Sequence, residues 1–197
     1  MTANERRFDP AKMQRLDAPD RGEHFPIEKI LDAIGIAASC TVADIGAGTG
    51  YFTLPLADRV ALGKVFAVDP SPELLQVLHG KLASSASNDT PRNVELISGE
   101  ACATTLADAS CDLIFLSAVW HEIDDRPAVL REFRRIASPN ARLAIVDWSP
   151  EGVTPPGPPL AHRIARTQVH SELTAAGWNV LKSKMITAST YLVLGQC

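Results

Sequence analysis

The stretch from Val42 to Thr53 constrains the fold most, because an apolar run passes directly into closely spaced glycines and then into a helical pattern. It reads Val-Ala-Asp-Ile-Gly-Ala-Gly-Thr-Gly-Tyr-Phe-Thr. Glycine lets the backbone turn tightly and lets a ligand approach where a Cβ would collide. The helix that follows presents free N–H groups and the positive end of its dipole. This order predicts an α/β unit with a ligand site at the glycine turn.

Short apolar strands continue to alternate with helical patterns along the chain. Strands are expected at 41–46, 64–69, 93–98, 111–117 and 142–147, and helices at about 26–34, 49–61, from 71 onward and at 126–137. Nearly continuous apolar strands separated by helices indicate a parallel sheet covered on both faces, with right-handed crossovers. The fold class is therefore a doubly wound, Rossmann-like α/β sandwich.

The pattern changes after Trp148. Residues 149–159 contain five prolines and two glycines, which predicts a loop. A helix is expected over 160–176, ended by Gly177 and carrying His162 and His170 on its surface. Two strand-like runs, 178–181 and 190–194, have no helix between them. They predict a closing antiparallel hairpin and, with the strands before them, a mostly parallel seven-stranded sheet.

Length and composition limit the class of protein. With 197 residues the chain is long enough for one buried domain and short for two. We expect a single domain made of an N-terminal cap segment (1–25), a ligand-binding core (26–148), and a final part (149–197) with the proline-rich lid loop, the helix and the hairpin. The formal net charge of −4 excludes the broad basic surface that nucleic acid requires.

Location and metal binding are judged from what the sequence lacks. The polar N-terminus has no apolar core of a signal peptide, and no apolar run reaches the length of a membrane span, so we expect a cytoplasmic protein. The four cysteines (Cys40, Cys102, Cys111 and Cys197) show no metal-ligand spacing, so no metal is expected. The oligomeric state stays open.

An acidic residue beyond the glycines points to an adenosine-containing ligand. Asp69 ends the second strand, nineteen residues after Gly50, where a carboxylate accepts hydrogen bonds from a ribose diol. A dinucleotide fingerprint would require a third glycine where Tyr51 stands. Asp44 disfavours a pyrophosphate and suits an ammonium group. S-adenosylmethionine carries an α-amino group and no phosphate, so the charges favour it over NAD.

Several segments resemble the class I S-adenosylmethionine-dependent methyltransferases, closest to a small quinone-biosynthesis-like branch. Asp44–Gly50 is similar to the first motif of the family, Val68–Leu75 to its ribose-binding segment, and Ser98–Ala101 to the stretch that frames adenine. Residues 111–123 resemble the fourth strand and the substrate-facing loop. The resemblance implies S-adenosylmethionine as cofactor, S-adenosylhomocysteine as product and a small-molecule acceptor. It assigns the cofactor to Asp44, Gly46, Ala47, Gly48, Thr49, Gly50, Asp69, Pro70, Gly99, Glu100, Ala101 and Ser117.

Two further segments are compared with the family. Residues 15–21 resemble a leader of one small-methyltransferase subgroup. Residues 138–141 depart from the family, because Ser-Pro-Asn-Ala stands where relatives usually carry Lys-Pro-Gly-Gly. This departure is expected on a turn away from the cofactor, so cofactor binding should be unaffected.

His121 is the candidate catalytic residue. It follows the fourth strand, at the carboxyl edge where open α/β sheets bind ligands, and histidine removes protons near neutral pH. Two interpretations stay open: His121 acts as a general base, or it only begins the next helix and lines the pocket wall.

Other functions are weighed beside small-molecule methyl transfer. A non-catalytic S-adenosylmethionine-binding regulator is the main alternative, since no acceptor-specific catalytic set is evident. An NAD-dependent oxidoreductase is disfavoured by Tyr51, Asp44 and the terminal hairpin. The absence of an Asn/Asp-Pro-Pro-Tyr motif weakens a nucleic-acid amino-methyltransferase. An arsenite methyltransferase is conceivable from the cysteine count, but the cysteines do not cluster in sequence.

Overall fold

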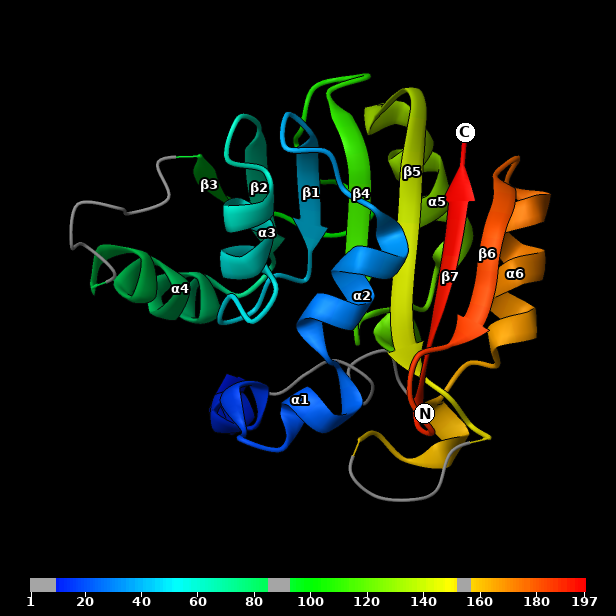
Figure 1. Cartoon of the computed structure of the whole chain (residues 1–197), viewed down its shortest axis with the longest axis horizontal. Helices are drawn as coiled ribbons and strands as arrows, with labels where there is room; N and C mark the ends of the chain where they lie inside the picture. Colours follow the sequence, from blue (N-terminus) through cyan, green and yellow to red (C-terminus); the bar gives the residue numbers. More distant parts are fainter. Residues whose placement is uncertain (1–9, 85–92, 152–156) are drawn as a thin grey trace.

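Seven strands form one sheet in the order β3-β2-β1-β4-β5-β7-β6 (Figure 1). This computed structural model describes residues 10–84, 93–151 and 157–197. Strands β1 to β5 pair in parallel, whereas β7 runs antiparallel to both β5 and β6. The predicted seven-stranded sheet with a closing hairpin is confirmed. The strands are β1 (Thr41–Ile45), β2 (Lys64–Asp69), β3 (Val94–Ser98), β4 (Cys111–Ser117), β5 (Ala137–Trp148), β6 (Asn179–Met185) and β7 (Thr190–Gln196).

Helices cover both faces of the sheet. Successive strand residues point to opposite faces, so Val42 packs in the core under α2 and α3, and the adjacent Ala43 packs in the core under α5 and α6. Helix α4 joins the first face through Leu78, which packs on Ala67 of β2. Figure 1 shows α2 and α3 in front of the sheet and α5 and α6 behind it. The α-helices are α1 (Arg21–His24), α2 (Ile27–Ile34), α3 (Thr53–Arg59), α4 (Pro72–Ser84), α5 (Arg126–Ile136) and α6 (Arg166–Ala175), and the 3-10 helices are η2 (Pro10–Asp17), η3 (Trp120–Glu122) and η4 (Leu160–His162).

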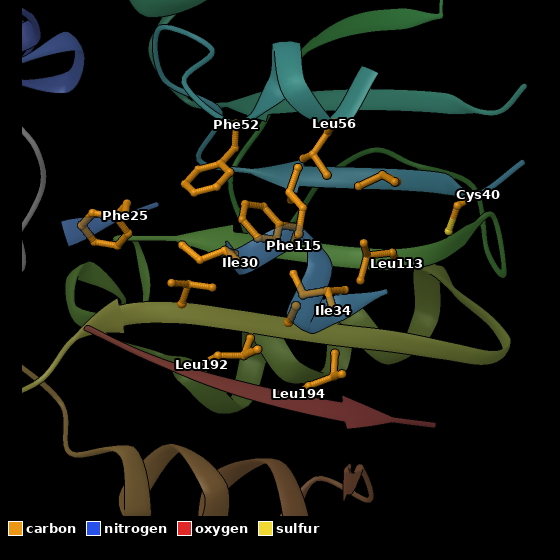
Figure 2. Close-up of a cluster of buried hydrophobic side chains, with 14 of the residues drawn as sticks. Phe25, Ile30, Ile34, Cys40, Phe52, Leu56, Leu113, Phe115, Leu192 and Leu194 are labelled. Carbon is orange, nitrogen blue, oxygen red and sulfur yellow. The ribbon is translucent and has the colours of Figure 1, made fainter. Parts of the chain in front are cut away.

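The core on the first face joins distant parts of the chain (Figure 2). Phe25 and Ile30 come from the N-terminal part, Phe52 from the segment before α3, and Phe115 and Leu192 from the sheet; all are at most 3% exposed. The rings of Phe52 and Phe115 lie 4.9 Å apart. Buried aromatic side chains contribute large apolar areas. This core therefore holds Phe25 and α2 against the last strand, β7.

Two predicted helix boundaries were wrong. The helix expected from residue 49 begins at Thr53, because Gly48 and Gly50 have φ of 55° and 91°, which a right-handed helix excludes. The helix expected from residue 160 begins at Arg166. Before it, Arg163 turns inward: its side chain is 6% exposed and donates to the carbonyls of Ser149 and Pro158. Arg163 and Ala165 have extended backbone, each with ψ of 138°, which a continuous helix excludes.

Strand lengths also differ from the expectation. Strand β5 extends over 137–148 instead of 142–147, and β6 over 179–185 instead of 178–181. The segment 138–141, expected as a turn, is included in β5, which bends at Asn140 with φ 65°. It lies at the amino end of the strand. Residues 152–156 of the predicted proline-rich loop lie outside the described residues, as do residues 1–9 of the predicted cap segment.

The carboxyl ends of the parallel strands lie along one edge of the sheet. In Figure 1 the arrowheads of β1 and β5 point downward, toward η2 and α1. The strand order reverses between β1 and β4, which is where open α/β sheets bind ligands. No helix among the described segments has the length and apolar character needed to cross a bilayer.

Two glycines, one just before β2 and one in α4, test the local packing. A Cβ on Gly63 would lie 2.1 Å from the carbonyl oxygen of Cys40, whereas a Cβ on Gly80, exposed in α4, would meet nothing within 4 Å. We expect Gly63→Ala to lower the free energy of unfolding by about 1–3 kcal/mol through overpacking. Gly80→Ala should raise it by about 0.5–1 kcal/mol through helix propensity. Urea denaturation followed by circular dichroism measures both, and equal stabilities would contradict the described turn.

Candidate active site

An open cleft of about 1250 Å³ lies at the carboxyl edge of the parallel strands. Segments following β1, β2, β3 and β4 line it together with η2 and α1. It brings together all predicted site residues except Asp44 and Gly50. The predicted residues that line the cleft are Gly46, Ala47, Gly48, Thr49, Asp69, Pro70, Gly99, Glu100, Ala101, Ser117 and His121.

The conformation of the glycine loop (residues 46–50) requires residues without a Cβ. All three of its glycines have positive φ, with 71° at Gly46. A Cβ on Gly46 would lie 2.3 Å from Cγ2 of Val119, and a Cβ on Gly50 would lie 2.3 Å from Cδ1 of Leu78. Gly46 thus permits close approach of the segment after β4. Gly50 does not line the cleft; it lets the loop pack against α4.

The end of β4 meets this loop through a strained backbone. Ala118 has φ of 57°, which a non-glycine residue rarely adopts, and its N–H donates to the carbonyl of Val146 at 2.9 Å. Such conformations concentrate at functional sites. The turn places Val119 against Gly46. Ser117, immediately before it, is 9% exposed and has a buried hydroxyl without a hydrogen-bond partner among the described residues.

Hydrogen bonds of Asp69 connect the glycine loop to the end of β2. Its Oδ2 accepts the N–H of Gly48 at 2.8 Å, its Oδ1 accepts the N–H of Ser71 at 2.9 Å, and the residue is 5% exposed. Burial raises the pKa of Asp69 above its ordinary value; the two N–H groups oppose this rise and Glu100 adds to it. A carboxylate has about four lone-pair sites, so Asp69 keeps acceptor capacity for a ligand hydroxyl.

The turn after β3 closes the same side of the cleft. The N–H of Gly99 donates to the carbonyl of Asp69 at 3.2 Å, and the N–H of Ala103 donates to the carbonyl of Glu100 at 2.9 Å. Gly99, Glu100 and Ala101 line the cleft beside Asp69 and Pro70. The two predicted nucleoside segments therefore face one space.

Asp44 is not among the lining residues. It is 3% exposed, and its Oδ2 accepts a hydrogen bond from the Thr53 hydroxyl at 2.6 Å. Burial raises the pKa of Asp44 to about 7; the Thr53 bond lowers it, Asp69 raises it further and Arg21 lowers it. The carboxyl group therefore lies behind the glycine loop and does not contribute to the cleft surface.

The N-terminal segment (residues 10–24, comprising η2 and α1) is attached to the glycine loop. Asp17 accepts a hydrogen bond from the Thr49 hydroxyl at 3.0 Å and pairs with Lys81 of α4 at 2.7 Å. Cδ1 of Leu16 lies 3.3 Å from the position that a Cβ on Gly48 would take. These contacts place the segment over the loop.

Arg21 brings a cation into the cleft. Its guanidinium carbon lies 4.4 Å from the ring centroid of Tyr51, and its Nη1 donates to the carbonyl of Leu16 at 2.7 Å. Its Nε is buried and has no hydrogen-bond partner in the described part of the chain. Burial lowers the pKa of Arg21, while Tyr51, Asp17 and Asp44 raise it. A buried N–H beside a cleft, left without an acceptor, suits an anionic ligand group.

Sequence reasoning missed Arg21 as a site residue. The available signal was the resemblance of residues 15–21 to a leader of one methyltransferase subgroup. That resemblance assigned no role to any single residue of the leader.

His121 forms a buried pair with Asp147. Its Nδ1 lies 2.8 Å from Asp147 Oδ1, its backbone N–H donates to Oδ2 at 3.0 Å, and its Nε2 lies 3.7 Å from Glu122 Oε1. Burial by itself lowers the pKa of His121, but Asp147 and Glu122 together raise it above its ordinary value, against a smaller opposing effect of Arg163. Sequence reasoning missed Asp147; the signal was an acidic residue at the end of the apolar run of β5.

Aromatic side chains form the wall next to this pair. The ring centroid of Trp148 lies 5.0 Å from that of Phe25 and 5.3 Å from that of His24, and all three residues line the cleft. His162 lines it as well and is half-buried, but it lies on a 3-10 helix before the predicted α-helix begins. It belongs to η4, before the buried Arg163, whereas His170 is exposed on α6 as expected.

The four cysteines do not come together. Cys40 and Cys111 are buried near the amino ends of β1 and β4, Cys102 is exposed at the cleft, and the thiol of Cys197 lies 3.3 Å from the carbonyl of Ser138. Across the described ranges, no group of three or more His, Cys, Asp and Glu residues is arranged to hold a metal ion. A three-thiolate arsenite site is therefore not formed by these cysteines.

Comparison with known proteins decides the family. The family model described as "Methyltransferase domain" matches residues 43–145. The chain belongs to the S-adenosylmethionine-dependent methyltransferase family. A solved S-adenosylmethionine-dependent methyltransferase from Aquifex aeolicus is 32% identical to this methyltransferase, with a TM-score of 0.89, over 96% of this chain and 99% of that chain.

Two curated relatives match over shorter stretches. An uncharacterized methyltransferase of Mycobacterium bovis is 34% identical over 149 residues, which are 76% of this chain and 56% of the relative. The ubiquinone/menaquinone biosynthesis C-methyltransferase of Hahella chejuensis is 30% identical over 120 residues, 60% of this chain and 47% of the relative. The chain thus matches about half the length of these curated relatives.

The buried Asp44 of this methyltransferase makes stability depend on pH. The folded-state pKa of about 7 lies above the ordinary 3.8, so the folded protein loses stability as pH rises from about 4 to about 7. Asp44→Asn still accepts from Thr53 and carries no charge. We expect it to raise the melting temperature of the ligand-free protein by several degrees at pH 8, at about 2–4 °C per kcal/mol, and by clearly less at pH 5, where only part of this stability has been lost.

Differential scanning calorimetry measures this difference. Asp58→Asn, at an exposed position of α3, serves as the matched control and should leave the melting temperature unchanged at both pH values. An unchanged melting temperature of Asp44→Asn at pH 8 would show that Asp44 is not buried as a charge.

Proposed function

We propose that this chain catalyses methyl transfer from S-adenosylmethionine to a small organic acceptor. The observation that carries the proposal is that one cleft holds both a set of groups complementary to an adenosyl amino acid and a buried histidine–carboxylate pair. Its volume exceeds the usual range for a single small ligand, roughly 300–1000 Å³, which supports a cofactor and an acceptor bound together. S-adenosylhomocysteine would be the product that stays in the cleft.

The cofactor fits the charges around the glycine loop. Arg21 offers an unpartnered N–H to the carboxylate, and the nearby field of Asp44 favours the α-ammonium group. Asp69 keeps acceptor capacity for the ribose, and Glu100 lies in the turn beside it, at the side proposed for adenine. Gly46 and Gly48 leave the backbone open to close approach, because a Cβ at either position would be strained. When bound, S-adenosylmethionine supplies an electrophilic methyl group on its sulfonium.

The chain's own contribution to the reaction is alignment and proton removal. An in-line displacement gains most from holding the nucleophile and the methyl group in line and from excluding water. His121 would accept the proton of the acceptor at Nε2, while Asp147 holds the ring through Nδ1. The N-terminal segment over the glycine loop would limit access of water to the cofactor.

Two observations separate this proposal from its alternatives. Tyr51 occupies the place of the third dinucleotide glycine, and the Asp44 carboxyl would oppose a pyrophosphate, which argues against NAD. The His121–Asp147 pair inside the cleft argues for an enzyme over a non-catalytic binder. The Hahella chejuensis relative is named for quinone biosynthesis, which supports a ring acceptor without identifying it.

The proposed contact between Arg21 and the carboxylate of the cofactor can be tested with two ligands, one with and one without the amino-acid part. We expect Arg21→Gln to weaken S-adenosylhomocysteine about tenfold or more, since a charge-assisted hydrogen bond contributes about 1.5–3 kcal/mol. Its affinity for 5′-methylthioadenosine, which has neither carboxylate nor amine, should stay unchanged. Asp69→Asn should weaken both ligands, because the ribose is common to them. Isothermal titration calorimetry measures all four affinities.

Arg131→Gln, at an exposed position of α5, is the matched control and should bind both ligands as the wild type does. If Arg21→Gln binds S-adenosylhomocysteine normally, another group holds the carboxylate. If the wild type binds neither ligand, the proposed cofactor itself is wrong.

A further inference from the structure

His121 offers a base of fixed orientation to the cleft, where the molecule to be methylated would bind. A carboxylate only accepts hydrogen bonds, so the Asp147 contact of 2.8 Å assigns the ring proton of neutral His121 to Nδ1 and the lone pair to Nε2. The same carboxylate also accepts the backbone N–H groups of His121 and Trp148, at 3.0 and 2.7 Å. The side chains of His121 and Asp147 are 8% and 1% exposed. The imidazole is therefore held in one tautomer and one orientation, as a base requires.

The charges around Nε2 discriminate against an anionic acceptor. Glu122 Oε1 lies 3.7 Å from Nε2 and Asp147 lies on the other side of the ring, while the guanidinium of Arg163 donates to the carbonyls of Ser149 and Pro158. Arg163 offsets part of this negative charge, but the charge nearest to a carboxylate or phosphate acceptor at Nε2 would be the like charge of Glu122, in a partly desolvated site. A neutral acceptor would meet no such repulsion, and the imidazolium formed on proton transfer would be stabilised by both carboxylates.

Aromatic side chains line the cleft at the carboxyl end of β5, where the guanidinium carbon of Arg163 lies 5.3 Å from the ring centroid of Trp148. Trp148 directly follows Asp147 in the chain, so β5 supplies both the partner of the base and the largest aromatic side chain of the cleft. The ring of Phe25 meets Trp148 edge-on, with an interplanar angle of 84°. Val119 and Ile123 line the cleft around His121. This surface suits a planar ring better than a flexible polar chain.

We propose that the acceptor is a neutral molecule with a planar apolar ring and a weakly acidic hydroxyl, a phenol or an enol. This inference rests on the function proposed above. As the acceptor O–H bond breaks, its proton passes to Nε2 of His121 and the oxygen forms a bond to the methyl carbon. The bond from methyl to sulfur breaks and leaves its electron pair on sulfur, which gives S-adenosylhomocysteine. The imidazolium then releases its proton to water.

The matched probes are 2-naphthol and 2-naphthoate, which share a ring system and differ in charge. With the full chain and S-adenosylmethionine, we expect mass spectrometry to show 2-methoxynaphthalene from 2-naphthol and no methyl ester from 2-naphthoate. A methyl ester as the main product, or methylation of 2-naphthol on carbon, would overturn the proposal. A protein that binds S-adenosylhomocysteine in calorimetry but methylates neither 2-naphthol nor phenol would also overturn it, while the cofactor assignment would stand.

Variants of the pair test the base. His121→Asn should lower kcat at least about 100-fold, the usual contribution of general base catalysis, without changing the affinity for S-adenosylhomocysteine. The kcat of the wild type should rise with pH as His121 loses its proton, and Asp147→Asn should shift this rise to lower pH as well as lower the plateau, because Asp147 no longer favours the imidazolium while Glu122 and Arg163 remain. His170→Asn, at an exposed position of α6, is the matched control.

A structural role of Asp147 would lower the melting temperature or the cofactor affinity and leave the pH profile in place. That result, or an unchanged kcat in His121→Asn, would contradict the assignment of the base.

Discussion

One buried carboxylate fixes the geometry on which the rest of the site depends. Asp69 accepts the N–H of Gly48 from the glycine loop and the N–H of Ser71 before α4, so a single side chain sets the distance between the ends of β1 and β2. The loop adopts left-handed φ values that only glycine takes without strain, and this lets it lie against Val119 after β4. The three strand ends therefore meet around one cleft.

The same region buries ionisable side chains, and their burial reduces the stability of the ligand-free protein. Burial raises the pKa of Asp44 and of Asp69, and Arg21 keeps an unpartnered N–H while its pKa is lowered by burial. A ligand with an ammonium group near Asp44, a carboxylate at Arg21 and a ribose hydroxyl at Asp69 would relieve these costs. The site is thus arranged so that stability lost in the free protein returns as binding free energy, which is a common exchange at functional sites.

Local patterns were sufficient to predict most of the fold. The strand, glycine and helix order around Gly46–Gly50 and the apolar runs of the five parallel strands are short-range features, and the structure confirms the sheet they predict. The glycine residues, Asp69 and His121 could be placed at one edge because parallel strands end there together. The hairpin followed from two strands without a helix between them.

What the sequence did not predict depends on contacts between distant residues. Asp147 meets His121 only because β5 lies next to β4, and Arg21 reaches the cleft only because η2 packs over the glycine loop. The predicted helix begins after Arg163 and not at residue 160, and a polar residue that becomes buried gives no signal of this in the hydrophobic pattern. Asp44 had a predicted contact with the ligand, and the structure instead places it off the cleft surface.

The central claim is that this cleft takes an adenosyl amino acid and not a dinucleotide. Isothermal titration calorimetry of the wild-type chain with S-adenosylmethionine, S-adenosylhomocysteine and NAD in parallel tests it most directly. The account predicts micromolar binding of the two sulfur ligands, on the order of −8 kcal/mol, and no heat with NAD. Binding of NAD alone would contradict it, and the glycine loop would then be a dinucleotide site.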